Sequence, residues 1–120
     1  MATILLVEDL PANRALATKL LHAAGHEVLT AETAAIGIAL ARERLPDLVL
    51  MDLGLPDMDG WQALAAIRAD RRASGLRVIA FTADAMLGDR ERALATGFDG
   101  YLTKPLDFAT FAESVRAYLP

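Results

Sequence analysis

The stretch Leu48-Val49-Leu50-Met51-Asp52 joins four consecutive apolar residues to a carboxylate, and the turn-rich segment Leu53-Gly54-Leu55-Pro56-Asp57-Met58-Asp59-Gly60 follows it. An apolar run without polar alternation predicts a strand that is buried on both faces, as parallel strands in α/β proteins are. Asp52 then lies at the carboxyl end of that strand, where open parallel sheets place their reacting groups. An acid there can take part in chemistry or simply cap the following turn.

The rest of the chain alternates apolar runs with segments of helical periodicity. Strands are expected at residues 3–7, 26–31, 48–52, 77–82 and 98–103. Helices are expected at residues 12–24 and 33–44, from near Asp59-Gly60, at 89–96, and from about Asp107. On the inner faces of the first two helices, periodicity places Ala12, Leu16, Leu20, Ala23 and Ala24, and then Ile36, Leu40 and Ala41.

Strands that alternate with helices predict an α/β fold, in which right-handed crossovers cover both faces of a parallel sheet. Five strand–helix units favour a flavodoxin-like, doubly wound (βα)5 fold with the strand order 2-1-3-4-5. In that order, the functional edge lies where the first and third strands diverge.

Length and composition limit the kinds of protein that the chain can be. Its 120 residues suit one domain, expected to span residues 1–120, with a core that needs no disulfide. No apolar run approaches the length of a membrane span and no charged-then-apolar leader precedes the first strand. We therefore expect a soluble, unprocessed, cytoplasmic protein without a membrane partner.

Charge and cysteine content exclude further classes. The absence of cysteine rules out disulfides and thiolate metal sites. The net charge of −4 is spread along the chain, and the longest basic cluster is Arg71-Arg72. This pattern argues against direct binding of nucleic acid.

Polar side chains stand at the carboxyl ends of four predicted strands: Glu8 and Asp9, Asp52, Thr82, and Lys104. Carboxylates brought together at one edge of a sheet repel one another unless a cation lies among them, and an all-oxygen site suits Mg²⁺. A Lys ammonium and a Thr hydroxyl are donors suited to phosphoryl oxygens. Asp52 could then attack phosphorus and form an aspartyl phosphate.

Each of these residues, taken singly, also has an ordinary structural explanation. Glu8 and Asp9 could be a solvated strand end, and Thr82 a turn hydroxyl. Tyr101 could be a sheet aromatic, and Lys104 a surface charge. Their joint occurrence at successive strand ends favours the site.

The chain resembles a response-regulator receiver domain of two-component signalling over essentially its whole length. The resemblance rests on Val7-Glu8-Asp9, on residues 50–60, on Phe81-Thr82-Ala83, and on Gly100-Tyr101-Leu102-Thr103-Lys104-Pro105. It implies that Asp52 accepts a phosphoryl group from a histidine kinase or a histidine phosphotransfer protein. It also implies that Asp9, Asp52 and the Gly54 carbonyl hold Mg²⁺, while Glu8 orients a water of the metal.

The same resemblance implies a switch and an output surface. Thr82 would move toward the phosphoryl group, the Tyr101 ring would turn inward, and a cis peptide before Pro105 would aim Lys104 at the phosphate. The face formed by the fourth helix, fifth strand and fifth helix would contact a downstream signalling protein, through Met86, Leu87, Tyr101, Leu106 and Phe108. The chain would act as a phosphorelay shuttle, an adaptor or the receiver of a longer regulator or hybrid kinase, and not as a classical enzyme.

Two other functions fit the same fold class. A phosphatase that passes through an aspartyl phosphate generally has a second acid two residues after the nucleophile, and here that residue is Gly54. A flavin- or nucleotide-binding domain needs a glycine- or hydroxyl-rich phosphate loop after the first strand. Glu8-Asp9-Leu10-Pro11 occupies that place instead.

Overall fold

The computed structural model describes residues 2–82, 89–103 and 110–119. Five parallel strands form one sheet in the order β2-β1-β3-β4-β5, so the predicted fold class and strand order are confirmed. The strands are β1 (Thr3–Val7), β2 (Glu27–Ala31), β3 (Leu48–Asp52), β4 (Val78–Thr82) and β5 (Gly100–Thr103). Within the described residues, the helices are α1 (Pro11–Ala23), α2 (Ala34–Arg44), α3 (Gly60–Ala69), α4 (Asp89–Thr96) and α5 (Phe111–Arg116).

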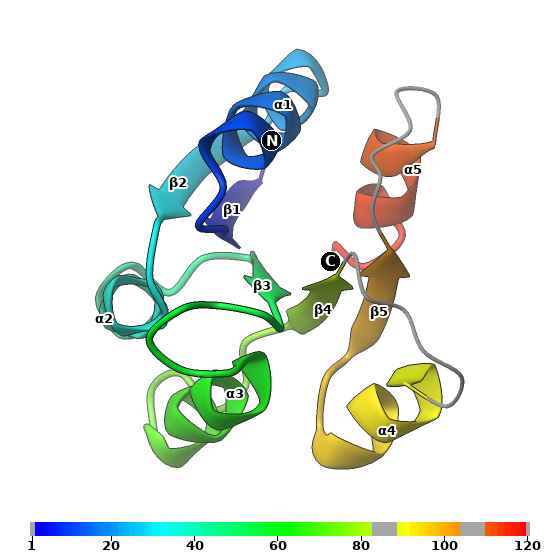
Figure 1. The fold of residues 1–120 in the computed structure, drawn as a ribbon. Coiled ribbons are helices and arrows are strands. Elements are labelled where there is room, and N and C mark those ends of the chain that lie inside the picture. The colour runs from blue at the N-terminus through cyan, green and yellow to red at the C-terminus, as the bar shows by residue number, and fades with distance from the viewer. Residues whose placement is uncertain (1, 83–88, 104–109, 120) are drawn as a thin grey trace.

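The helices form two layers on opposite faces of the sheet (Figure 1). α1 and α5 cover one face, and α2, α3 and α4 cover the other. Strand alternation divides the core accordingly: Ile4 and Leu6 of β1 face α1 and α5, whereas Leu5 and Val7 face the opposite layer. All residues of β3 are buried, as predicted for a strand covered on both sides.

Side-chain caps define where two of the helices begin. Asp59 accepts the backbone N–H of Gln62 at 2.8 Å, and the Gln62 side chain accepts the N–H of Asp59, which completes a capping box at α3. Thr33 Oγ1 accepts the N–H of Ile36 at 3.2 Å at the start of α2. The predicted start of the third helix near Asp59-Gly60 is therefore confirmed.

The predicted inner faces of α1 and α2 are partly wrong. Ile36 is 48% exposed, and the residues of α2 that are buried are Ala34, Gly37, Ile38 and Ala41. In α1 the buried residues are Ala17 and Leu21, while Ala12, Ala23 and Ala24 are exposed.

Close packing explains the error in α2. A Cβ added to Gly37 would lie 2.6 Å from Cγ2 of Val7, so the helix approaches β1 more closely than a branched side chain at this position would allow. The small residues of α2 therefore face the sheet, and Ile36 turns outward. Hydrophobicity alone predicts that isoleucine faces the core in preference to glycine. Here the short distance between α2 and β1 leaves room for glycine but not for isoleucine.

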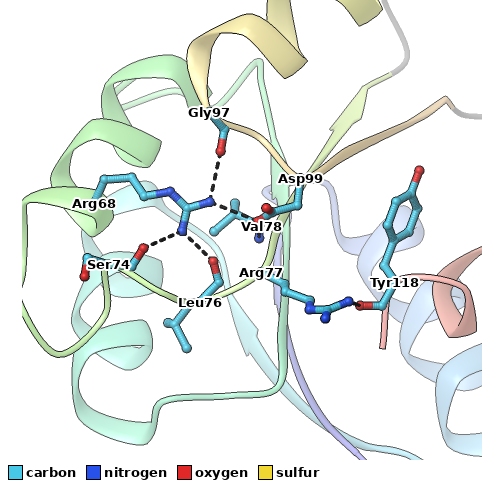
Figure 2. Close-up of polar contacts among 8 residues, drawn as sticks. All are labelled: Arg68, Ser74, Leu76, Arg77, Val78, Gly97, Asp99 and Tyr118. Atoms are coloured by element: carbon cyan, nitrogen blue, oxygen red, sulfur yellow. Dashed lines mark hydrogen bonds and ion pairs between the residues drawn. The ribbon is translucent and has the colours of Figure 1, made fainter. Parts of the chain in front are cut away.

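Arg68 at the end of α3 joins two connections at the edge of the sheet where β4 and β5 begin (Figure 2). Its Nη1 donates to the carbonyls of Ser74, at 2.9 Å, and Leu76. Its Nη2 donates to the Gly97 carbonyl at 2.9 Å and to Asp99 Oδ2 at 3.0 Å. The same Asp99 oxygen accepts the N–H of Val78, the first residue of β4, at 2.8 Å.

An aromatic contact links α3 with the α4 region. Trp61 and Phe98 meet edge to face with ring centroids 5.5 Å apart, and the Arg92 guanidinium lies 4.3 Å from the Trp61 ring centroid. In the part of the chain that the structure describes, no helix combines the length and apolar character needed to cross a membrane.

Candidate functional site

The register of β1 and β3 brings the first two acids together. Val7 pairs with Met51, so Glu8 and Asp52 are the next residues on adjacent parallel strands. Glu8 continues the series Ile4 and Leu6, and Asp52 continues the series Leu48 and Leu50, so by alternation both side chains belong to the α1 and α5 side. Strand pairing alone thus places these carboxylates side by side.

Glu8, Asp9 and Asp52 form a cluster of three carboxylates, in which one oxygen of each lies within 4.8 Å of the others. Glu8 is fully buried, Asp52 is 7% exposed, and Asp9 is partly exposed. Negative charges held this close and out of water repel one another strongly unless a cation compensates them. Because all three donors are carboxylate oxygens, and Asp9 leaves the cluster open to water, the residues fit a hard divalent cation such as Mg²⁺.

Backbone contacts hold this cluster in place. The N–H of Gly54 donates to Asp52 Oδ1 at 3.0 Å, and the N–H of Leu10 donates to Glu8 Oε2 at 3.3 Å. Arg14 Nη1 donates to the main-chain carbonyls of Glu8, at 3.0 Å, and Asp9, at 3.3 Å. Arg14 thereby ties the turn that carries the two acids to the first turns of α1.

The predicted switch pair lies on the two neighbouring strands β4 and β5. Thr82 pairs with Thr103, and Tyr101 pairs with Ala80, so Thr82 and Tyr101 lie on the same face one pleat apart. Thr82 is 5% exposed and Tyr101 is 7% exposed, with Tyr101 in the core beneath α2, α3 and α4. In this conformation, Tyr101 offers little surface to a partner.

Several predicted site residues lie outside the described part of the chain. They are Lys104, next after the end of β5 at Thr103, and the predicted contact residues Met86, Leu87, Leu106 and Phe108. Of the predicted site residues that the structure describes, Glu8, Asp9 and Asp52 form the cluster. Gly54 donates its N–H to the Asp52 carboxylate. This contact does not bear on the prediction that the Gly54 carbonyl binds Mg²⁺.

Sequence reasoning missed two residues around the site. Nothing in the sequence marks Arg14 as part of the site, because a contact with backbone carbonyls leaves no pattern in sequence. Asp57 stood within the acidic turn without a role of its own. In the structure its carboxylate accepts the N–H groups of Ala34 and Ala35, at 2.9 and 3.0 Å.

Known relatives match this chain along most of its length. DivK of Brucella ovis, a polar-differentiation response regulator, is 36% identical over 98% of this chain and 95% of its own length. The protein PilH of Pseudomonas aeruginosa is 39% identical over 99% of this chain and 98% of its own.

Solved structures agree with the fold. The chemotaxis response regulator CheY4 of Vibrio cholerae superposes with a TM-score of 0.91 at 26% identity, covering 99% of both chains. The receiver domain of a Pseudomonas aeruginosa sensor histidine kinase, which holds a magnesium ion in its active-site cleft, superposes with a TM-score of 0.87. It is 34% identical and covers 98% of this chain and 96% of its own.

A family model agrees with these relatives. The model of the response regulator receiver domain matches residues 4–116, which include every strand and helix described above except Thr3, the first residue of β1. The chain therefore belongs to the response regulator receiver domain family.

Proposed function

We propose that this chain, as one receiver domain over residues 1–120, accepts a phosphoryl group on Asp52 from the phosphohistidine of a histidine kinase or phosphotransfer protein. The observation that carries the proposal is the cluster of Glu8, Asp9 and Asp52 at the carboxyl edge of the sheet. Asp52 ends a strand that is buried along its whole length, so the backbone that carries its carboxylate is held rigidly by packing.

The chemistry is a displacement at phosphorus. A carboxylate oxygen of Asp52 attacks the phosphorus, the bond from phosphorus to the donor imidazole nitrogen breaks, and the imidazole leaves with that electron pair. Asp9, Asp52 and the Gly54 carbonyl would hold Mg²⁺, with Glu8 orienting its water. Once bound, the ion neutralises charge on the phosphoryl oxygens.

Thr82, Tyr101 and Lys104 are proposed to convert the phosphoryl group into a signal. Lys104 supplies an ammonium to the phosphoryl oxygens, and Thr82 supplies a hydroxyl. Thr82 and Tyr101 lie one pleat apart on the same face, so a shift of Thr82 changes the space next to the Tyr101 ring. The face with Met86, Leu87, Tyr101, Leu106 and Phe108 then changes its affinity for a downstream signalling protein, in the cytoplasm.

This role is that of a signalling module that hydrolyses its own phosphoryl group, and not that of a phosphatase. The residue two positions after Asp52 is Gly54, which has no side chain to act as the second acid. Its N–H instead contacts the Asp52 carboxylate. The lifetime of the phosphoryl group then depends on how easily water reaches it.

The first test is phosphorylation by acetyl phosphate with Mg²⁺, followed by intact mass. We expect one phosphoryl adduct, stable in acid and labile in base, that is lost with EDTA and in Asp52→Asn. Asp47→Asn is the matched control, because Asp47 is an exposed acid whose Oδ2 accepts the N–H of Thr3, at the other end of β1. An adduct at full level in Asp52→Asn would exclude Asp52 as the acceptor.

A further inference from the structure

Asp57 connects the loop that follows the phosphoacceptor strand to α2, the helix that packs against β1. Its Oδ1 accepts the N–H of Ala34 at 2.9 Å, and its Oδ2 accepts the N–H of Ala35 at 3.0 Å. The two donors are the first residues of α2, 23 and 22 positions earlier in the chain. Figure 1 shows the loop between β3 and α3 passing beside this helix.

Asp57 satisfies two of the N–H groups at the N-terminus of α2. An isolated helix leaves its first four N–H groups without intrahelical acceptors. Here Asp57 accepts those of Ala34 and Ala35, and Thr33 Oγ1 accepts that of Ile36, while the N–H of Gly37 makes the first intrahelical bond, to the Thr33 carbonyl. Two of the three side-chain acceptors at this helix start therefore come from the phosphoacceptor loop and one from Thr33, the N-cap residue.

Charge favours the same contact. The N–H of Ala34, and next that of Ala35, lower the pKa of Asp57 below its ordinary value of 3.8, so its carboxylate is charged at neutral pH. A negative charge at a helix N-terminus is also favoured by the helix dipole.

The loop of residues 53–59 is held at each end by a local hydrogen bond. Gly54 donates to Asp52 Oδ1 at one end, and Gly60 donates to the Leu53 carbonyl at 3.0 Å where α3 begins. Leu55 is buried in the core, whereas Gly54 and Pro56 are exposed. In the exposed middle of the loop, the Asp57 carboxylate supplies a polar link to another element.

We propose that Asp57 is a positioning residue for the Mg²⁺ site: by tying residues 53–59 to the N-terminus of α2, it holds the Gly54 backbone in the conformation that binds the ion. The inference rests on the proposed function, because the Gly54 carbonyl is a ligand only in that assignment. A loop freed from α2 samples other conformations. Its apparent affinity for Mg²⁺ is then the intrinsic affinity multiplied by the fraction of time that the loop spends in the binding conformation.

The test compares Asp57→Ala and Asp57→Asn with two matched controls. Thr33→Ala removes a cap from the same helix without touching the loop. Glu32→Gln removes one exposed negative charge just before that helix, and so reports the effect of charge alone. Asp57→Asn keeps one acceptor oxygen and supplies the measurement if the alanine variant does not fold.

Two readouts are taken on folded protein: the Mg²⁺ dissociation constant from the Gly54 amide shift in NMR, and the Mg²⁺ concentration that gives half the maximal rate of phosphorylation by acetyl phosphate. For both Asp57 variants we expect each value to rise by about 3- to 10-fold. This is the factor for a loop that adopts the Mg²⁺-binding conformation between about a third and about a tenth of the time. The rate at saturating Mg²⁺ should stay near that of the wild type, because Asp52 itself is unchanged.

Values for the Asp57 variants equal to those of Thr33→Ala or Glu32→Gln would overturn the inference and leave the proposed function standing. They would show that Asp57 acts only as a helix cap or only as a charge. A wild-type protein that takes up no phosphoryl group with Mg²⁺ would instead refute the proposed function, and the inference with it.

Discussion

At the residue scale, Gly60 marks the place where the start of α3 touches the backbone at the end of β3. A Cβ added to Gly60 would lie 2.8 Å from Leu53 Cα and 2.9 Å from the Asp52 carbonyl oxygen. Both are backbone atoms, which cannot turn aside as a flexible side chain can. Glycine at this position is therefore a requirement of packing between the helix and the residue that carries the site.

Gly60→Ala should destabilise the protein by about 1–3 kcal/mol, the usual cost of forcing an extra methyl group into a packed contact. The measurement is the free energy of unfolding in urea. Gly75→Ala is the control, since a Cβ there would meet nothing within 4 Å. We expect that variant to be neutral or slightly more stable, because alanine lowers the entropy of the unfolded chain. Equal stabilities for the two variants would contradict the close-contact explanation.

At the element scale, the connections before β4 and β5 depend on one charged pair. Arg68 donates hydrogen bonds to the carbonyls of Ser74, Leu76 and Gly97 (Figure 2). The Asp99 carboxylate accepts both from Arg68 and from the N–H of Val78, the first residue of β4. These contacts place the end of α3, the segment before β4 and the segment before β5 in one network. The carboxyl ends of β4 and β5, with Thr82 and Thr103, lie at the far edge of the same strands.

Asp99→Ala should cost about 1–3 kcal/mol of stability, because it leaves the N–H of buried Val78 without its acceptor. The free energy of urea unfolding gives the value. In Asp47→Ala, the matched variant, the N–H of Thr3 that loses its 2.8 Å acceptor lies at an exposed position, so water replaces the carboxylate. A cost for Asp99→Ala no larger than that for Asp47→Ala would mean that the Val78 contact contributes nothing beyond solvation.

At the scale of the whole molecule, we expect the acid cluster to lower stability until a cation binds to it. Glu8 and Asp52 are buried next to Asp9, and their mutual repulsion exists only in the folded state. A ligand that binds the folded protein and not the unfolded chain raises stability according to its concentration. The same three residues should therefore govern both the stability of the protein and its dependence on Mg²⁺.

In EDTA, Asp52→Asn should unfold at a higher urea concentration than the wild type, since it removes one of the repelling charges. Mg²⁺ at ten times its dissociation constant should stabilise the wild type by about 1.4 kcal/mol and the variant far less. Trp61 fluorescence and circular dichroism should report one transition, as for a single cooperative domain. An equal response of both proteins to Mg²⁺ would place the ion elsewhere.

Much of the fold and of the candidate site could be predicted from the sequence. The unbroken apolar run of β3, the strand-end acids Glu8, Asp9 and Asp52, and the Asp59 cap of α3 are local patterns whose consequences follow from strand alternation and helix capping. A parallel sheet brings the carboxyl ends of its strands to one edge, so the acidic cluster follows once the strands are located.

Only the tertiary structure decided which polar groups meet across the chain and how closely elements pack. Asp57 reaches the N–H groups of α2, Arg14 reaches the carbonyls of Glu8 and Asp9, and Ile36 turns away from the sheet. A carboxylate or a guanidinium is compatible with many partners, and the one it finds depends on distances set by the packing of distant segments. Sequence alone thus determined the strands and the acids at their ends, while packing decided what holds the loop beside Asp52.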